Sequence, residues 1–247
     1  MELILRDIVK KFDKKEVLTG ASASFASGKI YGLLGRNGAG KTTLFNVLNH
    51  DLKADGGEAL LADETGEREL RTEDIGYVLS TPTVPAFLTA REFVRFFLEI
   101  NPRRRPLVLA DGRTLPEDTD ADVYLGLVGI EEEDRGRLLR DFSHGMKSKV
   151  QLLVNILADT PVLLLDEPLT ALDVVAAEEM KALLREIRQD KILILSTHIM
   201  ELALTLCDDI TLLTGGKLAA LPETDETGRK LSDEEIRERV LETLREA

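Results

Sequence analysis

The sequence predicts an α/β fold built around a mostly parallel sheet. Two short, continuously apolar runs, residues 162–165 and 192–195, have the composition of strands that are buried on both faces. A helix-like segment at 174–189 lies between them, and this succession is typical of a βαβ unit with parallel strands. The 247 residues can bury a large core without disulfides or metal, and the single cysteine, Cys207, fits a reducing, intracellular compartment.

Composition and charge exclude several other classes of protein. Hydrophobic residues make up 43% of the chain and charged residues 31%, as in a globular protein and not a disordered one. The longest uninterrupted aliphatic run is far shorter than the roughly 20 residues of a membrane helix, and the charged start of the chain lacks the pattern of a secretory signal. The net charge of −13 argues against binding nucleic acid through phosphate neutralisation, so we expect no nucleic-acid partner.

The N-terminal half alternates between predicted strands and helices. Strands are expected at 2–9, 17–25, 29–34, 58–62 and 75–79. Helices are expected at 41–50, after a glycine-rich turn, and at 89–100, where phenylalanines recur at helical spacing. Residues 101–122 hold three consecutive arginines at 103–105 and three prolines, and we interpret them as a surface insertion whose charges face water.

The C-terminal half continues the alternation and ends in a helical tail. Helices are expected at 121–128, 131–139, 146–159 and 174–189, and a hairpin at 210–213 and 217–221. In the tail, Ser232 and Glu235 form a capping box with Leu231 and Ile236 as a hydrophobic staple. The apolar face of that helix predicts a packing partner, either the domain itself or another protein.

The clearest functional motif is the segment GRNGAGKT at residues 35–42, which fits G-x-x-x-x-G-K-[ST]. It follows an apolar strand and opens a helix, which is the context a phosphate-binding loop requires. Glycines let backbone N–H groups turn inward toward phosphate oxygens, and the helix N-terminus adds its positive end. Lys41 can reach the β- and γ-phosphates, and the Thr42 hydroxyl can bind Mg²⁺. The nucleotide contacts expected here are Gly35, Asn37, Gly38, Ala39, Gly40, Lys41, Thr42 and Thr43.

A second half of such a site follows the apolar strand at 162–165. Asp166 is placed to hold Mg²⁺, directly or through water, and Glu167 to polarise an attacking water. An acid after an apolar strand is by itself usually a turn or a helix cap. Its combination with the glycine loop favours the catalytic interpretation.

With these motifs in place, the chain resembles the ATP-binding subunits of ABC transporters, over about residues 2–221. The most diagnostic segment is FSHGMK at 142–147, which looks like the family's signature motif just before a helix. The resemblance implies that Ser143 and the N–H of Gly145 bind the γ-phosphate of ATP held by the other subunit. His144 stands where glycine is more common in the family, and this form is similar to exporter-type subunits, most like those of the ABC-2 type.

Further positions match the family in its own order. Asp173, in the segment ALD at 171–173, occupies the D-loop position. His198 matches the switch histidine that contacts the γ-phosphate, and we expect it to be catalytic together with Glu167 and Lys41. Phe12 stands where the family places an aromatic ring that stacks on adenine.

One position departs from the family pattern. After the predicted strand at 75–79 the family normally has a glutamine that contacts Mg²⁺ and the attacking water, whereas this chain has Ser80. A serine side chain is two carbons shorter and reaches a metal only through a water. We therefore expect Ser80 at the metal site, with weaker coupling between ATP binding and transport or with slower turnover.

The resemblance also implies an architecture and partners. It predicts a P-loop NTPase, RecA-like core with a mostly parallel sheet, an antiparallel β subdomain and an α-helical subdomain at about 83–157, all within an ATPase domain at 1–221 that precedes a tail at 222–247. It implies ATP and Mg²⁺, hydrolysis to ADP and phosphate, and dimerisation with a second copy or a related subunit. An integral-membrane permease would dock at about 83–88, at the cytoplasmic face of the cell membrane, and we expect export of a peptide, drug or lipid-like substrate.

Three alternatives remain at this point. Family relatives also act on DNA or ribosomes, although those usually carry two such domains, long coiled-coil arms or zinc-binding cysteines. An import-type subunit is the second alternative, although importers often carry a further β-domain and only 26 residues follow Leu221. A P-loop kinase is the third, and the Ser143, Gly145 and His198 positions argue against it.

Overall fold

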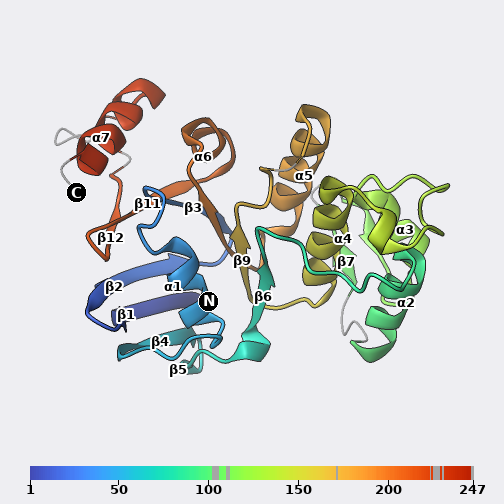
Figure 1. Cartoon of the computed structure of the whole chain (residues 1–247), viewed down its shortest axis with the longest axis horizontal. Helices are drawn as coiled ribbons and strands as arrows, with labels where there is room; N and C mark the ends of the chain where they lie inside the picture. The colour runs from blue at the N-terminus through green and yellow to red at the C-terminus, as the bar shows by residue number, and fades with distance from the viewer. Residues whose placement is uncertain are drawn as a thin grey trace.

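The computed structural model describes residues 1–101, 106–109, 112–170, 172–222, 224, 229 and 231–245. Its central feature is a six-stranded sheet with strand order β12-β11-β3-β10-β9-β6 (Figure 1). The strands are β3 (Lys29–Leu34), β6 (Ile75–Val78), β9 (Val162–Asp166), β10 (Ile192–Thr197), β11 (Asp209–Thr214) and β12 (Lys217–Ala220). Every neighbouring pair is parallel except β11 with β12, so the mostly parallel sheet is confirmed.

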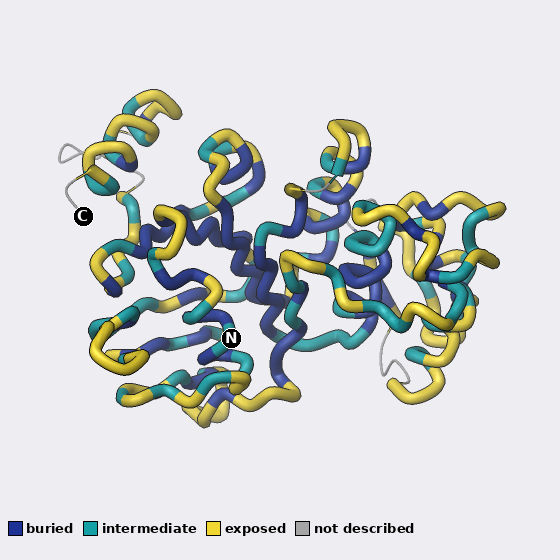
Figure 2. The backbone as a smooth tube through the Cα atoms, viewed as in Figure 1, coloured by how far each residue is buried: buried dark blue, intermediate teal, exposed yellow. Residues whose placement is uncertain are grey.

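Both faces of this sheet are buried, as the apolar strands predicted. Leu163 and Leu165 of β9 belong to a core shared with α4 (His144–Leu157) and α5 (Val174–Ile187). Val162 and Leu164 belong to a second core on the opposite face. The middle of the molecule in Figure 2 is accordingly dark blue along the central strands. Successive residues of a strand point to opposite faces, which is why one strand serves two cores.

The second core joins the parallel sheet to an antiparallel one. The four strands of the latter run in the order β2-β1-β4-β5. They are β1 (Glu2–Phe12), β2 (Lys15–Ala26), β4 (Gly56–Asp63) and β5 (Gly66–Glu69). Helix α1 (Lys41–Leu48) contributes Leu44 and Phe45 to the core between the two sheets. The sequence did not predict β5, because all four of its residues are exposed and leave no apolar pattern.

A helical subdomain lies at the other end of the molecule from the antiparallel sheet (Figure 1). It contains α2 (Ala90–Ile100), α3 (Ala121–Leu127) and α4. Val94, Tyr124 and Val150, one from each helix, are fully buried in the same core. Helix α2 is capped by Thr89, whose side chain accepts from the N–H of Glu92 while the Glu92 carboxylate accepts from the Thr89 N–H.

The prediction of a helix at 131–139 is wrong. This segment forms turns, and the chain then enters a short 3₁₀ helix, η2 (Leu139–Asp141). A tertiary contact overrides the helical pattern: the Leu139 N–H donates to the Leu88 carbonyl at 2.8 Å, and Leu138 forms a β-bridge with Thr89. A second 3₁₀ helix, η1 (Thr72–Asp74), precedes β6.

The interpretation of residues 101–122 as a surface insertion with solvated charge needs a correction. Strands β7 (Leu107–Val108) and β8 (Thr114–Leu115) pair as a small hairpin. Leu107 and Leu109 are buried in the core of the helical subdomain, so this part is anchored by apolar side chains. The arginines at 103–105 lie outside the described residues.

The tail helix α7 (Asp233–Arg245) packs on the domain, a point that the sequence left open. The capping box is present, because the Ser232 N–H donates to the Glu235 carboxylate at 2.8 Å and the Glu235 N–H to the Ser232 hydroxyl at 3.3 Å. Val240 is fully buried beside Ala203 of α6 (Met200–Leu206) and Leu212 of β11. In the part of the chain that the structure describes, no helix has the length and apolarity to cross a bilayer.

Candidate functional site: a phosphate cavity at the ends of the parallel strands

The glycine loop runs from the end of β3 to the start of α1, where the backbone must turn sharply. Gly38 and Gly40 have φ values of +79° and +108°, a region that favours glycine over residues with a Cβ. Gly35 is needed for another reason, since a Cβ there would lie 2.8 Å from the Leu213 carbonyl oxygen. Glycine is therefore needed at 38 and 40 for the backbone angle and at 35 for lack of space.

Lys41 is the first residue of α1 and is only 8% exposed. Its Nζ donates to the Gly35 carbonyl at 2.8 Å, within the loop itself. Burial lowers the pKa of Lys41, and the nearby Glu167 and Asp166 carboxylates oppose that shift. The ammonium group is thus held inside the loop, where it can exchange a backbone acceptor for an anionic one.

Asp166 ends β9 and is 3% exposed. One of its oxygens accepts from the Thr42 hydroxyl at 2.9 Å, and the other accepts from the Ser196 hydroxyl. Ser196 lies opposite Asp166 in the parallel pairing of β10 with β9. The strands end at one edge of the sheet, so their polar residues meet there.

The same arrangement is a suitable partial site for Mg²⁺. A hard cation takes oxygen ligands, and Mg²⁺ in particular is bound by one or two protein groups together with waters and substrate phosphates. The Thr42 hydroxyl and the Asp166 carboxylate supply such a pair beside the glycine loop. Among the described residues, no group of three or more His, Cys, Asp or Glu could hold a metal without other ligands. The donor set therefore fits a cation that arrives with a nucleotide.

Glu167 follows Asp166 and has an unusual backbone, with a φ of +51° for a non-glycine residue. Such strained conformations persist only where the surroundings enforce them. Here the Glu167 N–H donates to the Ser196 carbonyl at 3.2 Å. The carboxylate lies 2.8 Å from His198 Nδ1 and accepts from the Thr170 hydroxyl at 3.2 Å.

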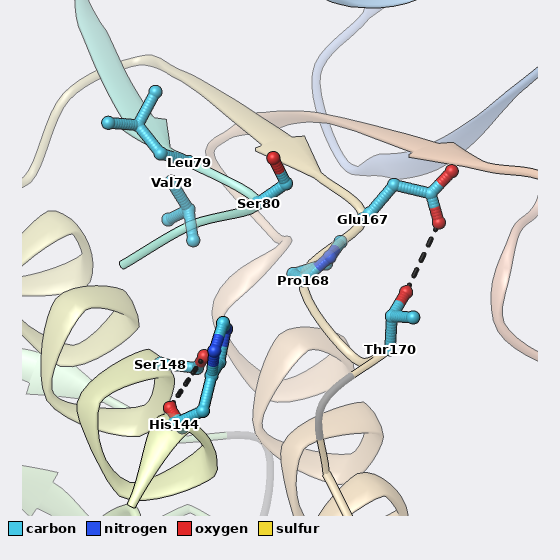
Figure 3. Close-up of a pocket in the computed structure, with 8 residues that line it drawn as sticks. All are labelled: Val78, Leu79, Ser80, His144, Ser148, Glu167, Pro168 and Thr170. Atoms are coloured by element: carbon cyan, nitrogen blue, oxygen red, sulfur yellow. Dashed lines mark hydrogen bonds between the residues drawn. The ribbon is translucent and has the colours of Figure 1, made fainter. Parts of the chain in front are cut away.

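These groups surround one cavity of about 340 Å³. Its lining residues are Val17, Asn37, Gly38, Gly40, Lys41, Thr42, Thr43, Ser80, Asp166 and Glu167. A second cavity of about 180 Å³ shares Ser80 and Glu167 with the first. Figure 3 shows this second space between Ser80, Glu167 and Thr170 on one side and His144 and Ser148 of α4 on the other. The glycine loop, the two acids and Ser80 are thus brought together as the sequence predicted.

Other predicted site residues lie away from the first cavity's lining. Phe12 ends β1 and is 43% exposed, with Lys10 Nζ 5.4 Å from its ring centroid. Ser143 is exposed and caps α4, accepting from the Met146 N–H at 3.2 Å, and Gly145 lies in the first turn of that helix. Asp173 caps α5 by accepting from the Ala176 N–H at 2.9 Å. Ala171, beside it, lies outside the described residues.

Gly35 and Ala39 serve the loop's own hydrogen bonds. The Gly35 carbonyl holds Lys41, and the Ala39 N–H donates to the Arg36 carbonyl at 3.0 Å. Sequence reasoning missed Ser196 and Thr170. Ser196 could have been found by aligning β10 with β9, which places it opposite Asp166. Thr170 is three residues after Glu167 and had no pattern to mark it.

A parallel sheet, a glycine loop between strand and helix, and an acid at the end of a neighbouring strand define the class of P-loop nucleoside triphosphatases. Within this class, the chain belongs to the ABC transporter family, whose model matches residues 18–170. It contains the ATP-binding and ATP-hydrolysing domain of that family, which uses ATP with Mg²⁺.

Two curated relatives and one solved structure illustrate the similarity. An uncharacterized ABC transporter ATP-binding protein of Nostoc sp. is 30% identical over 215 residues, 85% of this chain and 60% of the relative. The sulfate/thiosulfate import ATP-binding protein CysA of Methylococcus capsulatus is 29% identical over 231 residues, 92% of this chain and 64% of the relative. The chain thus spans less than two thirds of the length of either relative. A dimeric ATP-binding cassette in a post-hydrolysis state with ADP and phosphate has a TM-score of 0.72 at 20% identity, covering 90% of this chain and all of that one.

Proposed function

We propose that the protein is the ATP-hydrolysing subunit of an ABC transporter, and that two copies close head to tail around two molecules of ATP to drive a separate membrane permease. The observation that carries this proposal is the cavity of about 340 Å³, which Lys41, Thr42 and Asp166 line together with Glu167. The proposal covers hydrolysis, dimerisation and transport by the whole protein.

Each side chain of the cavity has a distinct task in this proposal. The N–H groups of the glycine loop cradle the phosphates, and Lys41 exchanges the Gly35 carbonyl for phosphate oxygens. Thr42 and Asp166 would hold Mg²⁺, which would neutralise phosphate charge, and Ser80 lines the same cavity. Glu167 orients and deprotonates the attacking water, and His198 contacts the γ-phosphate.

Dimerisation explains the residues that lie outside the first cavity. Ser143 and Gly145 lie at the N-terminus of α4, which suits an anion brought by a second copy. Asp173, at the start of α5, lies near the same interface in this proposal, and the exposed ring of Phe12 is accessible for stacking on adenine. Half of the γ-phosphate contacts then come from the other subunit, so hydrolysis requires the dimer.

A membrane partner has a candidate docking site in the helical subdomain. Residues 83–85, Phe87, Leu88 and one side of α2 line an apolar cavity of about 740 Å³. Phe87 and Phe96 in it are 77% and 53% exposed. Exposed apolar patches of this kind commonly mark protein interfaces. We infer that a cytoplasmic helix of the permease binds there, which places the subunit at the cytoplasmic face of the cell membrane.

The experiment that tests the catalytic proposal is Glu167→Gln, which keeps the side-chain shape and removes the base. The variant is expected to bind ATP, to lose hydrolysis by about 100-fold or more, and to accumulate as a dimer with saturating ATP and Mg²⁺. Light scattering measures the dimer and phosphate release the activity. A Glu167→Gln protein that hydrolyses ATP normally, or that stays monomeric in ATP, contradicts the proposal.

Export is the proposed direction of transport, because the segment SHGM at 143–146 is similar to exporter-type subunits. The import function in the name of the CysA relative keeps import as the alternative. Purifying the subunit from membranes and identifying the polypeptide that accompanies it distinguishes these two. Co-purification with ribosomes or DNA would instead favour a non-transport function.

A further inference from the structure

Glu167 lies between the two cavities and lines both of them. Both of its oxygens have a partner: His198 Nδ1 lies 2.8 Å from Oε1, and the Thr170 hydroxyl lies 3.2 Å from Oε2. An ionised carboxylate can only accept, so the Thr170 O–H is the donor. Figure 3 shows Thr170 pointing its oxygen directly at Glu167. Two side chains from different segments, His198 and Thr170, therefore restrain the carboxylate.

The backbone around Glu167 is fixed independently of these contacts. The Glu167 N–H is bound to the Ser196 carbonyl, and Glu167 and Thr170 are joined by a turn in which the Thr170 N–H donates to the Glu167 carbonyl at 3.3 Å. A fixed backbone still leaves the torsions of the glutamate side chain free to choose among staggered rotamers. What selects the rotamer must be contacts of the carboxylate itself.

Packing does not supply that selection on the side facing Ser80. The cavity of about 180 Å³ that Ser80, Thr170 and Glu167 share leaves space beside the glutamate. A long side chain at position 80 would occupy part of that space, and serine does not. The Thr170 hydroxyl is thus the directional restraint on Oε2, while His198, 48% exposed, holds Oε1.

We propose that Thr170 is a positioning residue for hydrolysis, whose hydroxyl holds the Glu167 carboxylate in the rotamer that faces the phosphate cavity. Thr170 lines the second cavity and not the phosphate cavity, so it acts through Glu167. This inference rests on the proposed function, in which Glu167 activates the attacking water.

The test compares Thr170→Val, which keeps the shape and removes the O–H, with Thr170→Ser, which keeps the O–H. In the full chain, Thr170→Val is expected to lower kcat by about ten-fold, the size of effect of losing a hydrogen bond to a charged group, with the KM for ATP within two-fold. Thr170→Ser is expected to retain kcat within about three-fold of the unchanged protein. The matched control is Thr205→Val, since Thr205 is exposed on α6 and its hydroxyl bonds only within that helix.

Each contrary outcome has one meaning. A Thr170→Val protein with unchanged kcat, beside an inactive Glu167→Gln protein, overturns the positioning role and leaves the proposed function standing. Equal losses of kcat in the Val and Ser variants, accompanied by a lower Tm, also overturn it, because they indicate a structural role. An active Glu167→Gln protein removes the proposed function itself, and the inference with it.

Discussion

The strand-end edge of the sheet and the N-terminus of α4 are two halves of one proposed reaction site, and they are built differently. At the strand ends, Asp166 and Lys41 are buried, and Lys41, Thr42 and Asp166 all have hydrogen-bond partners within the chain. At α4, Ser143 is exposed, and its hydroxyl accepts from the Met146 N–H of its own helix. The first region is preorganised for phosphate by the core behind it, whereas the second presents a helix end outward. In the proposed mechanism, one chain is therefore sufficient to bind ATP and two are needed to hydrolyse it.

The largest expected effect comes from the strand-end region. Lys41→Ala removes the buried cation of the phosphate cavity, and we expect loss of ATPase activity by more than about 100-fold together with weakened nucleotide binding. Phosphate release and equilibrium binding of a fluorescent ATP analogue measure the two effects. Lys181→Ala is the matched control, because Lys181 is also mostly buried but pairs with Glu178 within α5, outside the cavity. Full binding by Lys41→Ala would show that this half-site is not assembled as described.

A next, more selective effect is expected at Ser143. Ser143→Ala removes both the cap of α4, worth about 0.5–2 kcal/mol, and the proposed contact with a second copy's ATP. Ser143→Asp keeps the cap but places a negative charge against the γ-phosphate. Both variants should lose about 100-fold in ATPase activity while binding ATP normally as monomers, and only the alanine variant should have a lower Tm.

The cap of α2 provides a control for Ser143. Thr89→Ala removes a capping box of the same subdomain and should lower the Tm with ATPase activity retained. If Ser143→Asp hydrolyses ATP like the unchanged protein, the exposed end of α4 has no part in the reaction, and the comparison between the two halves fails.

The smallest effect is expected where the two regions meet, at Ser80. Ser80→Gln restores the longer side chain of the family pattern, and the cavity of about 180 Å³ has room for it. We expect turnover and Mg²⁺ affinity to rise by about five-fold at most, the scale of a single hydrogen bond. Ser148→Gln fills the same cavity from α4 and should not reproduce the gain. Unchanged turnover and unchanged Mg²⁺ affinity would mean that position 80 does not limit the reaction.

Much of the phosphate site was readable in advance because it depends on local chemistry. The spacing of Gly35, Gly40 and Lys41 reflects a backbone path that only glycine allows, and apolar runs such as 162–165 mark strands that are covered on both faces. The contacts that hold the two acids in place could not be predicted from the sequence. Ser196 reaches Asp166 through strand register, and Thr170 reaches Glu167 through a turn that gives no compositional signal.

The errors in the helical subdomain have the same origin. The helical pattern at 131–139 loses to the bond from the Leu139 N–H to the Leu88 carbonyl, which joins segments far apart in the sequence. The polar composition of residues 101–122 gives no sign that Leu107 and Leu109 are buried. Their burial depends on a core that other segments supply. Local propensity is a weak term that such contacts override.

The sequence by itself determined the two sheets' main strands, the phosphate loop and the identity of the acids that follow β9, because glycine geometry and apolar periodicity act over a few neighbouring residues. Only the tertiary structure decided that α7 covers Ala203 and Leu212, that Glu167 is held by both His198 and Thr170, and that Ser143 faces outward. Those outcomes depend on contacts between segments that are distant in the sequence. Such contacts stabilise the protein only after folding of the core has brought the segments together.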